Sequence, residues 1–425
     1  MRMPGPHEGM ALIGSPLAAG HNDDVTSRIH AVQWRDDGLI AFKLSGGRVA
    51  GGEAPAGLEK LGDHFSVVEY RPWQRRMIFK FRDGYGFESE LGSASNKAPV
   101  RGRPVVYLDQ NQWSTMSKSL FAPQRVADPA ERLAAVQLLT MAEANRVILP
   151  MSAAHLSETG AWSNTIGRLE LAKTILAGSR GWQMRDALVV RADEFRGAIA
   201  MSAGLTSVGF RPVMTLEPYA ALDTNFRGSD SEVRLPPEVP ESWRAGYEST
   251  LSNVVYVACL LDREPTPRGS LEGWLHRVQE FSSWLESERQ RSKTARRRSA
   301  RLFAAADAMK EIASAAADVG ATPQQMTAWF AQRWDADDLG PPAVTFFRSV
   351  MVDKMLAGAR WEQNDLTDLM YLCTAAGYAD HVVGERRTVS LLGQTVRRLG
   401  APVKLHTKLE SVVEALRSEV GNITS

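Results

Sequence analysis

The segment from Val105 to Trp113 constrains this chain more than any other, because four apolar residues lead directly into Asp109. A short apolar run followed by polar residues predicts a strand that is buried on both faces. Open α/β sheets form their ligand sites at the carboxyl ends of their strands. The segment therefore predicts an α/β fold with a carboxylate at one edge of its sheet.

A second segment has the same pattern. The apolar run Val147–Met151 is followed by Ser152 and by a helical pattern that reaches Glu158. We expect a strand over 147–151 and a helix that begins near residue 153. This arrangement would bring a second acid to the edge that carries Asp109.

Three further acids lie near the C-terminus. Asp365 and Asp368 are three residues apart at the start of an alanine-rich helical pattern, so both can lie on one helix face. Glu385 directly follows an expected strand at Val382–Val383. Carboxylates gathered at one sheet edge repel one another unless a divalent cation lies between them. The five acids therefore indicate a metal site.

Composition excludes several classes of protein. A chain of 425 residues is too long for one simple core, and its net charge of +1 leaves nucleic-acid binding to local patches. Cys259 and Cys373 lie in apolar helical patterns, which predicts free, buried thiols and a reducing compartment. No run approaches the ~18 apolar residues of a membrane span, and no signal peptide is recognisable. We expect a cytoplasmic protein without a membrane partner.

The chain is expected to fold in several regions. Asp37-Gly38 and Asp83-Gly84 separate alternating apolar runs, as the turns of antiparallel hairpins do. The expected regions are a flexible N-terminus (1–27), a small antiparallel β domain (28–95), the first part of a parallel-sheet domain (105–175), a helical insertion (176–358) and the second part of that domain (359–425). Further helices are expected over 128–145, 243–261, 270–315 and 323–333, and a last strand over 403–405.

In their order along the chain, these features resemble the PIN-domain nucleases, and more narrowly bacterial PIN-like proteins with a large helical insertion. Asp109 matches the first aspartate of that family, Glu158 its helix glutamate and Asp368 its later aspartate. The number of residues between Asp368 and Glu385 is close to the number that usually separates the last two acids of that family. The resemblance covers about 105–165 and 360–410. The family often has Thr-x-Asp after its late strand, and this chain lacks that motif. Asp380 is therefore an alternative to Glu385 as the last acid of the site.

The resemblance implies a PIN-like parallel sheet flanked by helices and a metal-dependent nuclease, with RNA preferred to DNA as substrate. It also implies a role as a toxin or defence effector. Two Mg²⁺ or Mn²⁺ ions about 3.5–4 Å apart would activate a water and compensate the charge of the phosphate. Such hard cations prefer carboxylate oxygens as ligands.

The expected site follows from these arguments, together with its structural alternatives. Asp365 could instead cap its helix, and Glu385 could form an ion pair with Arg386 or Arg387. His155 fits a packed helix histidine better than a metal ligand. The expected catalytic residues and metal ligands are Asp109, Glu158, Asp368 and Glu385, with Asp365 as a further ligand and Asn111 and Ser152 as supporting residues.

A basic run could bind a phosphate backbone. Its alternative is a solvated helix face, aided by Glu286 and Glu288 just upstream. The run contains Arg289, Arg291, Lys293, Arg296, Arg297, Arg298 and Arg301.

Two other functions remain open at this stage. One is a PIN-like scaffold without catalytic activity that binds nucleic acid or a partner protein, and the other is a phosphatase that uses the same acids. A regulatory protein partner or a homo-oligomer is compatible with the sequence. Convergence of Asp109, Glu158 and Asp368 on one point would favour the enzyme over the scaffold.

Overall fold

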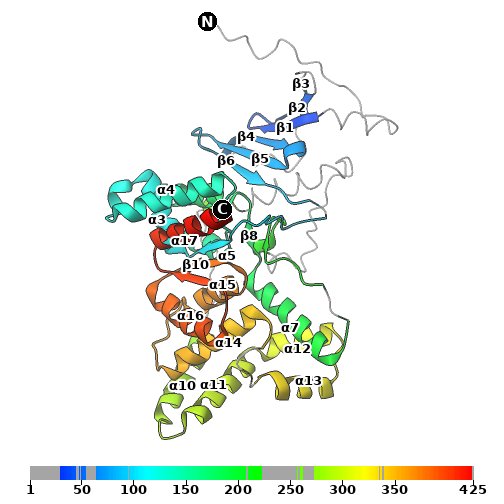
Figure 1. The fold of residues 1–425 in the computed structure, drawn as a ribbon. Coiled ribbons are helices and arrows are strands. Elements are labelled where there is room, and N and C mark those ends of the chain that lie inside the picture. The colour runs from blue at the N-terminus through cyan, green and yellow to red at the C-terminus, as the bar shows by residue number, and fades with distance from the viewer. Residues whose placement is uncertain are drawn as a thin grey trace.

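The chain has a mixed α/β fold with an antiparallel N-terminal sheet and a small parallel sheet, as the sequence predicts. The computed structural model describes residues 29–44, 47, 49–53, 64–93, 95–206, 209–222, 256, 259–261, 272–334, 336 and 339–423. In Figure 1 the N-terminal sheet lies at the top, the parallel sheet in the middle and a mainly helical part at the bottom. Within the described ranges, no helix is long and apolar enough to cross a membrane.

Six strands form the antiparallel sheet, in the order β3-β2-β1-β4-β5-β6. Gly38 and Gly84 adopt φ angles of 76° and 87° in the turns between β1 and β2 and between β5 and β6, which confirms both predicted hairpins. Strands β3 and β4 lie outside the expected runs, and in β3 two glycines weaken the strand pattern. The strands are β1 Ile29–Arg35, β2 Leu39–Leu44, β3 Val49–Glu53, β4 Phe65–Arg71, β5 Arg76–Phe81 and β6 Gly86–Glu90.

The parallel sheet joins the two segments that carry the predicted acids. Its strands β7 (Val106–Leu108), β10 (His381–Val383) and β11 (Lys404–His406) lie in the order β11-β10-β7. Tyr107 pairs with Val382, so segments far apart in the sequence meet in one sheet, as expected.

The prediction of a strand over 147–151 is wrong. Ile148 forms one isolated parallel bridge to Val105, and Met151 forms another to Gln183. Pro150 lies between them and has no N–H to donate, so a regular ladder cannot run through this segment. The segment still lies beside β7, because the N–H of Val106 donates to the carbonyl of Ile148 at 2.9 Å.

The parallel sheet separates two apolar cores. Tyr107 and Val382 belong to one core, whereas Val106, Leu108 and Val383 belong to the other, as the alternation of side chains along a strand requires. All five side chains are buried, which confirms a strand covered on both faces. The first core contains residues of α7 Ala187–Ala203, α14 Pro342–Leu356 and α15 Asp365–Tyr378. The second contains residues of α3 Gln110–Phe121, α4 Pro129–Glu143, α6 Thr165–Ser179 and α17 Leu409–Ile423.

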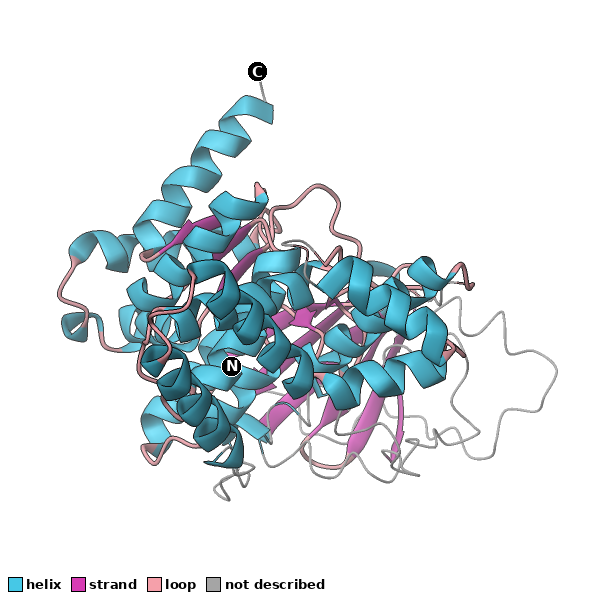
Figure 2. Ribbon diagram, turned by 90° about the horizontal axis from the view of Figure 1, so that it is seen from below, coloured by secondary structure: helices cyan, strands magenta, loops and turns pink. Residues whose placement is uncertain are grey.

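Figure 2, which looks from below, shows helices in front of the strands. The remaining helices are α5 Ala153–Gly160, α10 Glu272–Ser287, α11 Lys293–Asp307, α12 Met309–Asp318, α13 Pro323–Trp329 and α16 Arg386–Leu399. The short elements are β8 Gln183–Met184, β9 Met214–Thr215, the 3₁₀ turns η1 Pro72–Gln74, η2 Pro123–Arg125 and η3 Ala220–Leu222, and the π-helical turn η4 Phe330–Trp334.

One long helix over 270–315 was expected, and the structure has three helices there. The side chain of Ser292 accepts a hydrogen bond from the N–H of Ala295, so a new helix starts at Lys293. The helix predicted over 128–145 is present as α4, whereas most of 243–261 lies outside the described residues. Cys373 is buried, Cys259 is half-buried and both are free thiols.

Glu194 of α7 holds the helical part against the helices beside the site. Its carboxylate accepts hydrogen bonds from the N–H groups of Ala343 (2.9 Å) and Val344 (2.7 Å) in the first turn of α14. It also accepts one from the hydroxyl of Tyr378, at the end of α15. A buried carboxylate at a helix N-terminus satisfies N–H groups that otherwise lack partners. One acid therefore fixes α7, α14 and α15 relative to one another.

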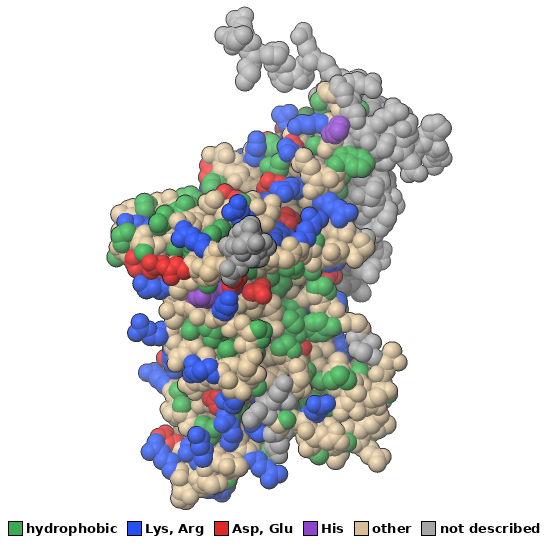
Figure 3. Space-filling model, viewed as in Figure 1, with side chains coloured by type: hydrophobic (Ala, Val, Ile, Leu, Met, Phe, Trp, Pro, Cys, Tyr) green, Lys and Arg blue, Asp and Glu red, His purple; other side chains and the backbone are tan. Residues whose placement is uncertain are grey.

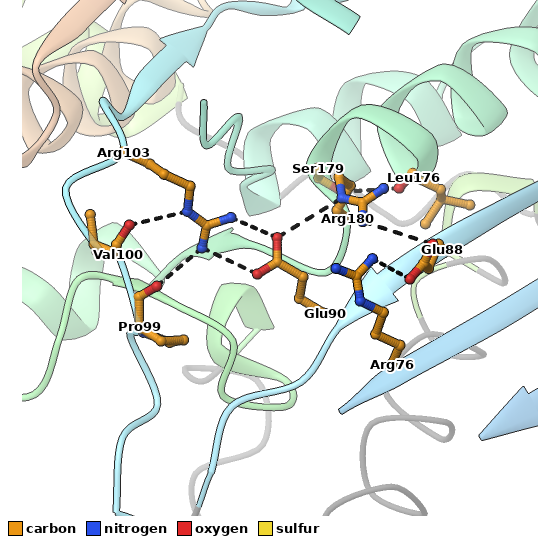
Figure 4. Close-up of polar contacts among 9 residues, drawn as sticks. All are labelled: Arg76, Glu88, Glu90, Pro99, Val100, Arg103, Leu176, Ser179 and Arg180. Carbon is orange, nitrogen blue, oxygen red and sulfur yellow. Dashed lines mark hydrogen bonds and ion pairs between the residues drawn. The ribbon is translucent and has the colours of Figure 1, made fainter. Parts of the chain in front are cut away.

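The N-terminal sheet is attached to the rest of the chain by a network of arginines and glutamates (Figure 4). Arg103 donates to both carboxylate oxygens of Glu90, at 2.8 and 3.1 Å, and these side chains are 10% and 16% exposed. The backbone N–H of Glu90 also donates to the carbonyl of Arg180, at the end of α6. Glu88 forms an ion pair with Arg76 nearer the surface. The Glu90 pair therefore fixes β6 onto the linker and α6.

Glu90→Gln is expected to lower the free energy of unfolding by about 1–3 kcal/mol, because it leaves the guanidinium of Arg103 without its charged partner in a largely buried place. Glu88→Gln is the matched control and should cost less than about 1 kcal/mol, because a third of that side chain is exposed and its contact with the buried Arg180 is long, at 4.0 Å. Urea unfolding of both variants measures the difference. Equal losses would contradict the assignment of the attachment to Glu90.

Candidate active site

Four of the predicted carboxylates line one pocket of about 240 Å³. Asp109 follows β7, Glu158 lies on α5, Asp368 lies on α15 and Glu385 precedes α16. Because β7 and β10 are parallel, their carboxyl ends bring Asp109 and Glu385 to the same edge. The other lining residues are Tyr107, Gln110, Asn111, Ala154, His155, Asn364, Tyr371, Leu372 and Thr388.

Asp109 is held from both sides. Its backbone N–H donates to the carbonyl of Val383, and its carboxylate accepts from the N–H of Gln112 at 3.1 Å, which caps α3. The pKa of Asp109 is raised to about 7, first by burial and then by the charges of Glu385 and Asp368, although two backbone N–H groups act in the opposite direction. The carboxyl therefore titrates near neutral pH.

Glu385 lies at the N-terminus of α16, and its carboxylate accepts a hydrogen bond from the side chain of Asn111. Asn111, which was expected as a supporting residue, thus holds the carboxylate of Glu385 in place. Asp380 lies at the opposite edge of the sheet, where its carboxylate accepts from the backbone N–H of Val105 at 2.7 Å. The structure places Glu385 in the pocket and leaves Asp380 out of the pocket lining.

Asp368 and Asp365 have different surroundings, although both lie in the first turn of α15. Burial, followed by the charges of Asp365 and Glu385, raises the pKa of Asp368 to about 6. Asp365 forms an ion pair with the buried Lys354 and accepts from the N–H of Glu362. It is absent from the pocket lining, so its expected role as a direct metal ligand has no support in this geometry.

The segment before Glu158 is held by polar contacts beneath the pocket. Ser152 is fully buried and lies 3.0 Å from the hydroxyl of Tyr107, and its backbone N–H donates to Nδ1 of His155. Nε2 of His155 bonds the carbonyl of Leu108 at 2.8 Å, and burial lowers the pKa of this imidazole to about 4. His155 is thus a packed, neutral histidine, as expected. Ser152 and His155 tie the start of α5 to the end of β7, which brings Glu158 to the pocket.

The donor set fits Mg²⁺ or Mn²⁺ by its chemistry, because carboxylate and amide oxygens are the ligands such ions prefer. Burial and the neighbouring acids raise the pKa values of Asp109 and Asp368, so a bound cation would stabilise their charged forms. Among the described residues, however, no three His, Cys, Asp or Glu side chains are grouped to hold one ion. The carboxylates share a pocket without converging on a single point.

Two pocket residues were missed by the sequence analysis although local signals existed. Tyr371 lies one helical turn after Asp368, and Gln110 directly follows Asp109. Lys354, which pairs with Asp365 and lies 4.5 Å from the ring centre of Trp361, had no such signal. Its position depends on the packing of α14 against α15.

The predicted basic run is divided by the break before α11. Arg289 pairs with Glu286, Arg291 with Glu288, and both precede the helix. On α11, Arg297 pairs with Asp353. The remaining members are Lys293, Arg296, Arg298 and Arg301. Part of the positive charge is therefore compensated, and the run does not form one helical face.

Comparisons with known proteins add no family: no protein-family model, no curated protein and no solved structure matches this chain.

Asp109→Asn is expected to raise the free energy of unfolding at pH 8 by about 1–3 kcal/mol. A folded-state pKa of about 7, against 3.8 for the unfolded chain, means that the folded protein holds a proton between these values that the unfolded chain has lost. The wild-type protein therefore loses stability as the pH rises from about 4 to 7. Asparagine caps a helix as well as aspartate and avoids this loss.

Unfolding of wild-type and variant protein at pH 4 and pH 8 without divalent cations measures the effect, and the two should agree at pH 4. Asp128→Asn is the matched control, because Asp128 also caps a helix but is exposed, and a hydrogen bond from Lys408 lowers its pKa. The control should show no gain at pH 8. A similar gain in both variants would contradict the role of burial at Asp109.

Proposed function

We propose that this protein is a metal-dependent nuclease that hydrolyses phosphodiester bonds of RNA at the acidic pocket, within a PIN-like parallel-sheet domain. One observation carries the proposal: carboxylates from four segments of the sequence line a single pocket. Two of them, Asp109 and Asp368, have pKa values raised by burial and mutual repulsion. A structural core would avoid such a concentration of acids, whereas a site for divalent cations requires it.

The residues of the pocket have complementary roles in this proposal. Asp109, Asp368 and Glu385 would hold the cation once the pocket closes around it, and Glu158 lines the same pocket from α5. When bound, Mg²⁺ or Mn²⁺ lowers the pKa of a ligated water and compensates charge on the phosphate. The oxygen of a water attacks phosphorus while a pocket carboxylate takes one of its protons. The bond from phosphorus to the leaving oxygen breaks, and that oxygen takes a proton from solvent to leave as the hydroxyl of the product. Asn111 acts as a positioning residue, because it donates to Glu385.

RNA is proposed rather than DNA on the resemblance to PIN-like proteins alone, as is a role as a toxin or defence effector. A phosphatase would use the same acids on a terminal phosphate. Assays with labelled single-stranded RNA, single-stranded DNA and a phosphomonoester, each with Mg²⁺, Mn²⁺ or EDTA, separate these substrates. Cleavage of the phosphomonoester alone would replace the nuclease by the phosphatase.

The second candidate is a scaffold that binds nucleic acid or a protein partner without catalysis. It is favoured by the absence, among the described residues, of any three metal-ligating side chains grouped around one point. The two proposals differ in one requirement: only the nuclease needs the pocket side chains to close around a cation.

Asp109→Asn is expected to lower RNA cleavage at least about 100-fold in Mn²⁺, because it removes a charged cation ligand while the helix cap remains. Cleavage of labelled single-stranded RNA gives the rate, and circular dichroism checks the fold. Asp380→Asn is the matched control and should cleave normally, because an asparagine oxygen can still accept from Val105. A folded Asp109→Asn protein with the wild-type rate would exclude the proposed site.

Glu385→Gln should weaken Mn²⁺ binding on the order of tenfold or more, whereas Asp380→Asn should leave it unchanged. Isothermal titration calorimetry of both variants measures the difference. The expectation follows from the strand geometry, since the two acids lie at opposite ends of β10. Loss of binding in Asp380→Asn alone would reverse the assignment, and no Mn²⁺ binding by the wild-type protein would favour the scaffold.

A further inference from the structure

Helix α16 starts at the acidic pocket and carries positive charge at both of its ends. Glu385 precedes it and Thr388, in its first turn, lines the pocket. Its sequence contains no acidic residue. The exposed positions recur at the spacing of one helix face. They are Arg386, Arg387, Ser390, Gln394, Arg397 and Arg398.

The far end of α16 is joined to α11 by one shared carboxylate. Asp353 of α14 accepts from Arg398 at 2.8 Å and from Arg297 at 2.5 Å, and only 12% of its side chain is exposed. One negative charge thus holds two guanidinium groups from two helices and leaves a net positive charge. Asp353 therefore joins the C-terminal end of α16 to the N-terminal half of α11.

Several cations on this surface are available to a ligand. Among the described residues, no carboxylate lies within ion-pair distance of the exposed Arg386 and Arg397 on α16, nor of the exposed Lys293 and the half-buried Arg296 on α11. Figure 3 shows Lys and Arg side chains along the left of the molecule from its middle to its lower end, where Figure 1 places α16 and, below it, α10 and α11. Positive charge thus gathers on this part of the surface although the whole chain is nearly neutral.

An exposed aromatic residue lies at the far end of this surface. Trp284 of α10 is 39% exposed, and the guanidinium of Arg291 lies 5.5 Å from its ring centre. Unpaired bases stack on aromatic rings and on arginine planes, whereas the bases of a duplex are already stacked. An acidic peptide or a duplex would gain little from such a group.

We infer that the exposed faces of α16 and α11 form one continuous track for the backbone of single-stranded RNA, which leads from Trp284 to the acidic pocket. At 1.5 Å per residue the 14 residues of α16 span about 21 Å. That length equals about six phosphate steps at the ~3.4 Å spacing of one duplex strand, and fewer steps of an extended strand. Arg386 lies at the pocket end, and Lys293 lies at the other.

The direction of the track rests on the proposed nuclease function, but binding to it does not require a metal or catalysis. The experiment measures the fluorescence anisotropy of a labelled 20-nucleotide poly(U) RNA in EDTA, at several salt concentrations. The variants are Arg386→Glu/Arg397→Glu on α16 and Lys293→Glu/Arg296→Glu on α11. Lys80→Glu/Lys310→Glu is the matched control, because it changes the net charge equally at exposed lysines of β5 and α12.

Each track variant should weaken binding on the order of tenfold at 50 mM salt, and the control should bind as the wild-type protein does. The slope of log K against log salt should fall by about 1.4 in each track variant, because each lost contact with a single strand contributes about 0.7. Thermal unfolding confirms that the variants are folded.

Equal weakening in the control would mean that overall charge, not the track, binds RNA. Weakening by the α16 variant alone would contradict the continuous track. Displacement of poly(U) by an equally long poly(Glu) at the same concentration would overturn RNA as the occupant.

Asp109→Asn retains every arginine and should bind RNA normally while losing cleavage. Cleavage at the wild-type rate by the α16 variant would exclude the track but not the nuclease. Tight RNA binding by a wild-type protein that cleaves no RNA would exclude the nuclease but not the track.

Discussion

The parallel pairing of β7 with β10 is the interaction on which the rest of the structure depends. It joins segments about 275 residues apart in the sequence, and Asp380 reinforces it by accepting from the N–H of Val105. The entropy of closing a loop rises only slowly with loop length, so burial on both faces of two short strands can offset it. The pairing brings Asp109 and Glu385 to one edge. Without it, the acids would belong to unrelated parts of the chain.

The acidic pocket is unfavourable for the stability of the folded chain. Burial and mutual repulsion raise the pKa values of Asp109 and Asp368, which means that their charged forms are held at a cost. Lys354 pairs with Asp365 and also acts to lower the pKa of Asp368, but burial and the charges of Asp365 and Glu385 outweigh it there. Sites that bind cations commonly carry this kind of unbalanced charge.

Helix α14 connects the helical part of the chain to both surfaces of interest. The carboxylate of Glu194, on α7, holds the N-terminus of α14 by accepting hydrogen bonds from two of its backbone N–H groups. Farther along, the adjacent residues Asp353 and Lys354 face different ways. Asp353 holds arginines of α11 and α16, whereas Lys354 holds Asp365 at the start of α15. The helical part thus contributes directly to the surroundings of the pocket and to the basic surface.

The sequence alone determined the local features that depend on neighbouring residues. Periodicity, turn residues and helix caps predicted β7, β10, the two Asp-Gly hairpins and α4, and the acid at the end of β7 pointed to the site. The expected strand at 147–151 failed at Pro150, and the basic run was divided at the helix cap Ser292, so both of these outcomes have local causes. The positions of Glu385 after an expected strand and of Asp380 before it also favoured Glu385 from the sequence. Tertiary structure alone left Asp365 out of the pocket and joined part of the basic run to α16 through Asp353. Local patterns reflect contacts between near neighbours, whereas these last two outcomes depend on pairings between different helices, which no local pattern encodes.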